Sequence, residues 1–97
     1  MFEIILTERA RKHWDRLKTD KGFEKRLRAV RKTLRFLSEN PRHPSLRTHE
    51  FTSLKGPQGE KVFEAYAEQS TPAAYRVFLY YGPEEKQIAI IAITPHP

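Results

Sequence analysis

Residues 75–81 read Tyr-Arg-Val-Phe-Leu-Tyr-Tyr, a run of β-branched and aromatic side chains with an arginine at its second position. Such side chains pack well on a pleated sheet, so the run predicts a strand. Arginine keeps its proton in proteins, so Arg76 must pair with an acid, bind an anion or face water. Two interpretations stay open from these residues: an exposed arginine on an edge strand, or a phosphate-binding arginine projecting from the sheet.

The second half of the chain predicts further strands around this run. The expected strands cover residues 48–53, 62–69, 74–82 and 87–94. Glycine, proline and acidic turn residues separate them, and such short links join antiparallel neighbours. Residues 88–93 are almost wholly apolar, which predicts an inner strand.

The first half predicts one strand and two helices. Residues 2–6 are strand-like, and residues 7–19 place Ala10, Trp14 and Leu17 on one helical face. A second helix is expected from residue 23 to residue 38. Its apolar positions recur at spacings of four and three and are Phe23, Leu27, Val30, Leu34 and Leu37.

These elements predict an α+β fold: an N-terminal strand, a helical hairpin, and a small antiparallel sheet whose apolar face the helices cover. At 97 residues, the chain is expected to form a single domain over 1–97. The chain has no cysteine, and its histidines are scattered, so no metal site or other cofactor is expected. No apolar run is long enough to span a bilayer, which predicts a cytoplasmic protein without a membrane partner.

Positive charge is concentrated in the first half of the chain. Residues 1–47 hold 14 Lys or Arg and 6 acids, whereas residues 48–97 hold 4 and 6. Such a basic half favours a polyanion such as nucleic acid, or an acidic protein segment, as partner. The second helix carries the candidate RNA-binding cations, which are Lys25, Arg28, Arg31, Lys32 and Arg35. A solvated helix face is the structural alternative for each of them.

A family resemblance rests on motifs in a fixed order. A strand and two helices precede the Leu54-Lys55-Gly56 turn, the Tyr75-Arg76-Val77 strand and a histidine, His96, after the last strand. This arrangement resembles the RelE/ParE superfamily of toxin–antitoxin toxins, over nearly the whole chain. The resemblance implies a microbial ribonuclease-like sheet. In the RelE branch it also implies metal-independent cleavage of messenger RNA in the ribosomal A site, by attack of the 2′-hydroxyl on the adjacent phosphate.

The resemblance also implies roles for individual residues. Arg76 would contact the scissile phosphate, Lys55 would hold phosphate as a point charge, and His96 would protonate the leaving 5′-oxygen. Glu50 and Glu64 are the available general bases. Glu64 is preferred because it alternates with apolar residues on a strand beside that of Arg76. A structural alternative is that Glu64 pairs with Arg76 across the sheet.

Three functions remain open at this level. The first is a ribosome-dependent messenger-RNA endonuclease, neutralised by an acidic antitoxin from a neighbouring gene. The second is a ParE-like toxin that binds DNA gyrase and cleaves nothing. The third is a protein-binding module that kept the fold and lost the chemistry.

Overall fold

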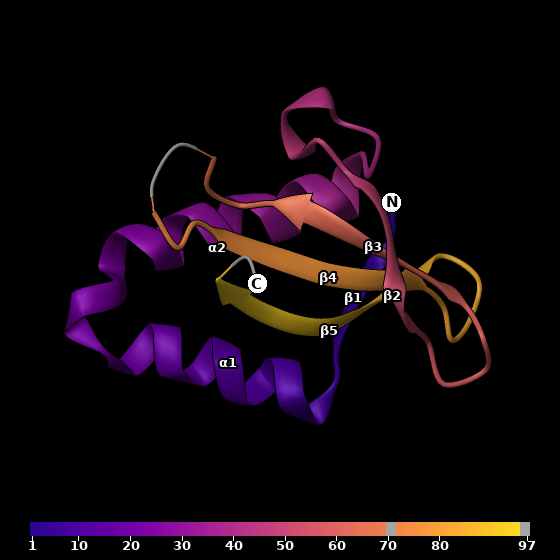
Figure 1. Cartoon of the computed structure of the whole chain (residues 1–97), viewed down its shortest axis with the longest axis horizontal. Coiled ribbons are helices and arrows are strands. Elements are labelled where there is room, and N and C mark those ends of the chain that lie inside the picture. Colours follow the sequence, from indigo (N-terminus) through magenta and orange to yellow (C-terminus); the bar gives the residue numbers. More distant parts are fainter. Residues whose placement is uncertain (70–71, 96–97) are drawn as a thin grey trace.

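The computed structural model describes residues 1–69 and 72–95, and within them an α+β architecture in which two helices lie against a five-stranded sheet (Figure 1). The strands are β1 (Glu3–Leu6), β2 (His49–Lys55), β3 (Lys61–Tyr66), β4 (Tyr75–Tyr81) and β5 (Gln87–Pro95). The helices are α1 (Glu8–Thr19) and α2 (Glu24–Glu39), with short 3-10 turns at Lys21–Phe23 and Pro44–Leu46.

The sheet order is β1-β5-β4-β3-β2, so β4 is the middle strand. The pairs β2–β3, β3–β4 and β4–β5 are antiparallel, which confirms the expectation drawn from the short links. The apolar strand at residues 88–93 is an inner strand, as predicted. The N-terminal strand, whose pairing the sequence did not predict, joins the sheet as a parallel neighbour of β5. A parallel pair needs a crossover, and here the segment with both helices supplies it.

Both helices bury the predicted apolar stripes against one face of the sheet. Ala10 and Leu17 of α1 and Val30 and Leu37 of α2 are buried in the same cluster as residues from the inner strands. The strand members of this cluster are Ala65, Val77, Leu79, Ile88, Ile90 and Ile93. Removal of this apolar surface from water is the main favourable contribution to folding.

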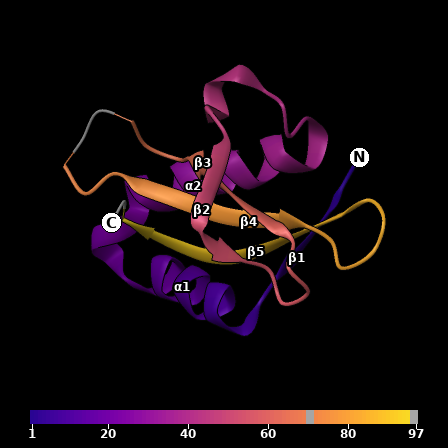
Figure 2. The ribbon, with the colours of Figure 1, turned by 45° about the vertical axis from the view of Figure 1, so that its right-hand side comes forward.

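The face away from the helices, which we call the open face, has its own small cluster. Val62, Phe78 and Ala92 are buried there, with Phe51 and Ile91 packed against them. Phe51 comes from β2, and its ring lies 5.0 Å from that of Phe78 in an edge-to-face contact. Figures 1 and 2 both show β2 crossing in front of the sheet, on the side opposite α2. The open face is therefore partly covered by this twisted edge strand.

The Leu54-Lys55-Gly56 turn joins β2 to β3 and has a steric basis. The Gly56 amide donates to the Glu60 carbonyl at 2.8 Å, and a Cβ at position 56 would overlap the Glu60 carboxylate. Gly59 adopts φ +84°, a conformation that glycine reaches without strain. A side chain at position 56 would therefore require the Glu60 side chain to move.

The buried core predicts that two leucines contribute very differently to the free energy of unfolding. Leu79 of β4 is 0% exposed, whereas Leu54 of β2 is 40% exposed. We expect Leu79→Ala to lower the free energy of unfolding by about 3 kcal/mol, because it leaves a cavity in the core. Leu54→Ala is the matched control and should lower it by less than about 1 kcal/mol. Urea unfolding followed by circular dichroism measures both, and equal losses would contradict the assignment of β4 to the core.

Candidate active site on the open face

Arg76 lies on the middle strand and is only 7% exposed, so its interpretation as an exposed edge-strand arginine is wrong. Its Nη1 donates to the carbonyl oxygens of Glu68 at 2.9 Å, Ala74 at 3.2 Å and Tyr75 at 3.4 Å. These oxygens belong to the segments that leave β3 and enter β4. The guanidinium thus holds both ends of the β3–β4 connection.

The same contacts explain why β3 is shorter than expected. The predicted strand extended to residue 69, but β3 ends at Tyr66. Beyond it, the amides of Ala67 and Glu68 both donate to the Tyr75 carbonyl at 3.2 Å, and the Glu68 carbonyl turns toward Arg76. Beyond Tyr66, the hydrogen bond from the Arg76 side chain to the Glu68 carbonyl takes the place of regular backbone pairing between strands.

Glu64 is the acidic partner of Arg76. Its carboxylate is 1% exposed, and its Oε2 lies 3.8 Å from Arg76 Nε. At this separation the contact is an ion pair, and Nε makes no hydrogen bond within the part of the chain that the structure describes. Tyr66, opposite Arg76 in the strand register, stacks its ring 3.8 Å from the guanidinium carbon. The preferred carboxylate and the predicted arginine are therefore adjacent on the open face.

His49 completes this group, and the sequence did not single it out. It lies opposite Glu64 on β2, and its Nε2 is 2.8 Å from Glu64 Oε1. Its Nδ1 faces the Arg47 carbonyl at 3.3 Å, and its side chain is 48% exposed. We call His49, Glu64, Tyr66 and Arg76 the Glu64 cluster. The sequence placed His49 on a strand next to that of Glu64, but the pairing of these two residues depends on the register between β2 and β3, which spacing within one strand does not give.

The cluster contains groups that suit proton transfer beside an anion. A buried carboxylate stands between an imidazole and a guanidinium, which is a fixed cation. Imidazole and carboxylate are common general acids and bases, and a guanidinium stabilises charge that develops on phosphate oxygens. Substrate would approach from the His49 side, since His49 is far more exposed than Glu64 or Arg76.

Lys55 lies apart from the Glu64 cluster. It is at the end of β2, opposite Lys61, and its Nζ is 3.9 Å from Glu50 Oε2. Lys61 is five residues from Tyr66, the register partner of Arg76, which corresponds to about 16 Å along the sheet. Lys55 and Arg76 therefore cannot hold the same phosphate in this conformation. His96, the predicted general acid, lies outside the described residues.

The candidate RNA-binding cations of α2 form a second, separate surface. Lys25, Arg28, Arg31, Lys32 and Arg35 are all exposed, and Arg28, Arg31, Lys32 and Arg35 line a shallow hollow on the helix. α2 itself lies on the other side of the sheet (Figure 1), but Arg28 and Lys32 line a further hollow together with Tyr66 of the Glu64 cluster. The structure therefore brings Arg28 and Lys32 to the margin of the Glu64 cluster, and no hollow that it describes joins Lys25, Arg31 or Arg35 to that cluster.

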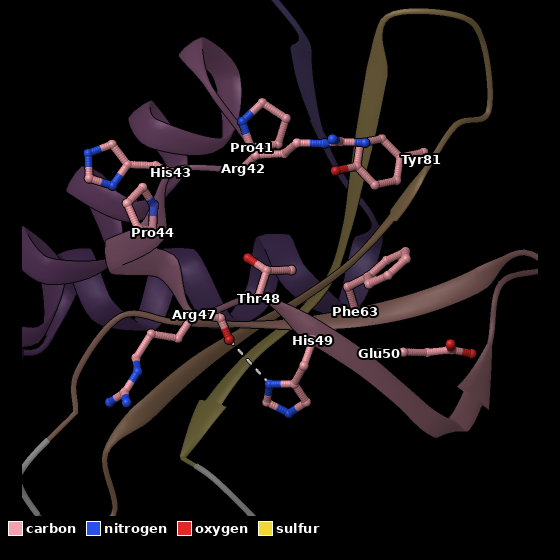
Figure 3. A pocket seen from close by; sticks show the side chains of 10 residues that line it. All are labelled: Pro41, Arg42, His43, Pro44, Arg47, Thr48, His49, Glu50, Phe63 and Tyr81. Atoms are coloured by element: carbon pink, nitrogen blue, oxygen red, sulfur yellow. Dashed lines mark hydrogen bonds between the residues drawn. The ribbon is translucent and has the colours of Figure 1, made fainter.

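A cavity of about 620 Å³ lies at the edge of the sheet beside β2 (Figure 3). Arg42, Thr48, Phe63 and Tyr81 contribute to its wall. Thr48 Oγ1 is buried there with no hydrogen-bond partner in the described ranges, and burial raises the pKa of Tyr81 against the opposing effect of Arg42. Phe63 and Tyr81 pack with the helix side, whereas Glu64 projects to the open face. His49 of the Glu64 cluster also lines this cavity, whereas Glu64, Tyr66 and Arg76 do not, so the cavity borders the cluster on its His49 side.

His13 of α1 fills an unusual structural role at the edge of β5. β1 pairs only with the first part of β5, up to Ile90. Beyond that point, Ile93 donates its amide to His13 Nδ1 at 3.0 Å, and Thr7 Oγ1 donates to the Ile91 carbonyl at 3.2 Å. The side chains of Thr7 and His13 thus satisfy backbone groups of β5 that a neighbouring strand would otherwise pair.

Neither a metal site nor a membrane span is found within residues 1–69 and 72–95. No three His, Asp or Glu side chains there are grouped closely enough to hold a metal ion. No helix there has both the length and the apolar character needed to cross a membrane.

Known proteins resemble this chain in fold. No family model matches the sequence, and no curated protein matches it. A YoeB/ParE toxin from Agrobacterium tumefaciens superposes with a TM-score of 0.70 at 12% identity, covering 99% of this chain and 100% of that one. YoeB from Staphylococcus aureus, solved as a dimer, gives 0.65 at 12% identity, covering 99% and 98%. The chain therefore has the fold of YoeB/ParE toxins, which confirms the fold that the sequence resemblance implied.

The buried ion pair predicts that Glu64→Gln changes the free energy of unfolding in opposite directions in the wild-type chain and in the Arg76→Gln variant. Arg76→Gln leaves the Glu64 carboxylate buried without its cation, and we expect a loss of about 3 kcal/mol in the free energy of unfolding. Glu64→Gln should destabilise the wild-type chain but stabilise the Arg76→Gln variant, because the buried carboxylate, although still 2.8 Å from His49 Nε2, has lost the fixed positive charge of Arg76. Urea unfolding at pH 7 of the four proteins in this cycle measures the effect. Simple additivity would show that the two side chains are not energetically coupled.

His13 predicts a loss of stability in mild acid. Burial lowers the pKa of His13 below 6.5, and Arg9 and Arg16 lower it further. The folded protein therefore binds this proton less readily than the unfolded chain, so stability is full above about pH 6.5 and falls as pH drops toward the folded-state pKa. His13→Asn keeps an acceptor for the Ile93 amide but does not titrate. Its stability should fall less than that of wild type between pH 7.5 and pH 5.5 in urea unfolding; parallel losses would exclude His13 as the cause.

Proposed function

We propose that this chain is the toxin of a two-gene toxin–antitoxin module and that it cleaves messenger RNA on the ribosome without a metal ion. The observation that carries the proposal is the Glu64 cluster, found on the open face of a sheet with the YoeB/ParE fold. A carboxylate, an imidazole and a guanidinium on three adjacent strands are the groups that such a cleavage needs.

The proposed reaction begins at the 2′-hydroxyl. The 2′-oxygen bonds to the adjacent phosphorus, its proton passes to the Glu64–His49 pair, and the bond from phosphorus to the 5′-oxygen breaks. The leaving 5′-oxygen takes a proton from a general acid, the role proposed for His96. The products are a 2′,3′-cyclic phosphate and a free 5′-hydroxyl. Arg76 offsets the charge that builds on the phosphate oxygens in the transition state.

The charge distribution supports binding to the ribosome. We assign the exposed cations of α2 to phosphates of structural RNA, since α2 lies on the helix side of the sheet, whereas Glu64 and Arg76 lie on its open face. Lys55 would contact a phosphate further along the message, because it is about 16 Å from Arg76 along the sheet. The antitoxin would be an acidic protein that covers part of this basic surface in the cytoplasm.

A second candidate is a toxin that acts by binding alone, without cleavage, as a ParE-like gyrase binder or another protein-binding module. The burial of the candidate groups favours it. Glu64 is 1% exposed, and Arg76 Nη1 is occupied by carbonyl oxygens. In that case the Glu64 cluster would serve only to hold β2, β3 and β4 together.

Translation-coupled cleavage of a defined messenger RNA on purified ribosomes separates the two candidates. Wild type should cut the message in the A site, and Glu64→Gln should reduce the rate by about a hundredfold or more, because the base is lost. Glu50→Gln is the matched control: Glu50 is the other candidate acid, on β2 and exposed, and its removal should change the rate by less than about threefold. Thermal unfolding confirms that each variant is folded.

The outcomes have distinct meanings. If wild type leaves the message intact, cleavage is excluded and the binding candidate replaces it. If Glu50→Gln is inactive and Glu64→Gln is active, the chemistry stands but its base is Glu50.

A further inference from the structure

A second cavity, of about 320 Å³, lies on the open face between α1 and β2, over β4 and β5. Figure 2 shows how α1 passes along one side of β5 while β2 crosses the sheet. The lining residues are Arg9, His13, Phe51, Leu54, Phe78, Ala92 and Thr94. Three of the strands and one helix therefore converge on it.

The floor of this cavity is apolar and aromatic. Phe78 and Ala92 are nearly buried, and Phe51 meets Phe78 edge to face at 5.0 Å. Leu54, one of the exposed large apolar side chains, stands at its margin. An aromatic floor of this kind suits a flat ring, because bases stack on aromatic side chains whatever their sequence.

The rim of the cavity carries polar groups with free hydrogen-bonding capacity. Arg9 is exposed and forms no ion pair within residues 1–69 and 72–95, so its charge is free to meet an anion. His13 accepts the Ile93 amide at Nδ1, so in the neutral ring the proton is on Nε2. That N–H has no protein acceptor in the same ranges and is a donor of fixed direction.

The cavity adjoins the Glu64 cluster. Phe78 is the register partner of Glu64, and Thr94 is the register partner of Arg76. Phe78 also follows Arg76 by two positions on the same face of β4, which places their Cα atoms about 7 Å apart. The base and the phosphate of one nucleotide are separated by a comparable distance, since a single sugar joins them.

We propose that this cavity is a nucleobase subsite, which holds the base next to the phosphate presented to the Glu64 cluster. The base stacks on Phe51 over the Phe78 floor, Arg9 binds a flanking phosphate, and His13 Nε2–H donates to an acceptor on the base edge. This inference rests on the proposed function, because it names the part of the RNA substrate that the open face holds.

The test is an NMR titration of the full ¹⁵N-labelled chain with a 2′-O-methyl trinucleotide, which cannot be cleaved because its 2′-oxygen is blocked. We expect the amide signals of Phe51, Phe78 and Ala92 to shift. Phe51→Leu, which keeps apolar bulk but loses the aromatic face, should weaken binding about tenfold. With a trinucleotide whose central residue is abasic, the same substitution should change binding by less than about twofold, because the stacked base is absent.

Two exposed arginines of α1 give the electrostatic control. Arg9→Gln should weaken binding and reduce its dependence on salt, because a phosphate contact is lost. Arg11→Gln changes the same charge on the same helix, but Arg11 is not among the residues that line this cavity, and it should have a smaller effect. Circular dichroism of each variant excludes loss of fold as the cause.

The subsite is overturned if the shifts are confined to α2, if Phe51→Leu acts equally on the intact and the abasic trinucleotide, or if the intact one does not bind. Its failure is distinct from failure of the proposed function. A protein that cuts messages on ribosomes but binds the trinucleotide through α2 keeps the function and loses the subsite. A protein that shows the Phe51-dependent base contact but never cuts keeps the subsite as an RNA-binding site and loses the endonuclease.

Discussion

The ion pair between Arg76 and Glu64 is the constraint on which the open face depends. A cation that cannot lose its proton occupies the middle strand of the sheet, so its surroundings must supply oxygen atoms and a negative charge. Backbone carbonyls at the ends of β3 and β4 and the Glu64 carboxylate supply them. This requirement ends β3 early, sets the path of the chain into β4 and gives His49 a buried oxygen to bind.

The two faces of the sheet differ in composition and in what they contribute. The helix side buries a continuous apolar cluster and supplies stability, while its outer surface carries a dense set of cations. The open side has a smaller apolar cluster, charged groups that face each other, and a hollow beside them. The charged groups can be kept in a low-dielectric setting because the sheet is already held from behind by the helices.

Local patterns in the sequence were enough to predict much of this fold. The stripe of Val30, Leu34 and Leu37 identified a helix face, and the alternation in residues 62–66 placed Glu64 on a strand beside Arg76. The parallel pairing of β1 with β5 was not predictable in this way, because it depends on a crossover that no short link reveals. His49 was missed for a similar reason: its significance comes from the register of β2 against β3, which spacing within one strand does not fix.

The position of β5 also affects when the protein can fold during its synthesis. β5 lies between β1 and β4, so residues from the beginning of the chain have no strand to pair with until residues 87–95 have left the ribosome. The helices likewise lack the inner strand on which Ala10 and Leu17 pack. Contacts of such long sequence separation form late and slowly. The open face therefore assembles only after residues 87–95 have left the ribosome, later than the synthesis of the residues on β2, β3 and β4 that it contains.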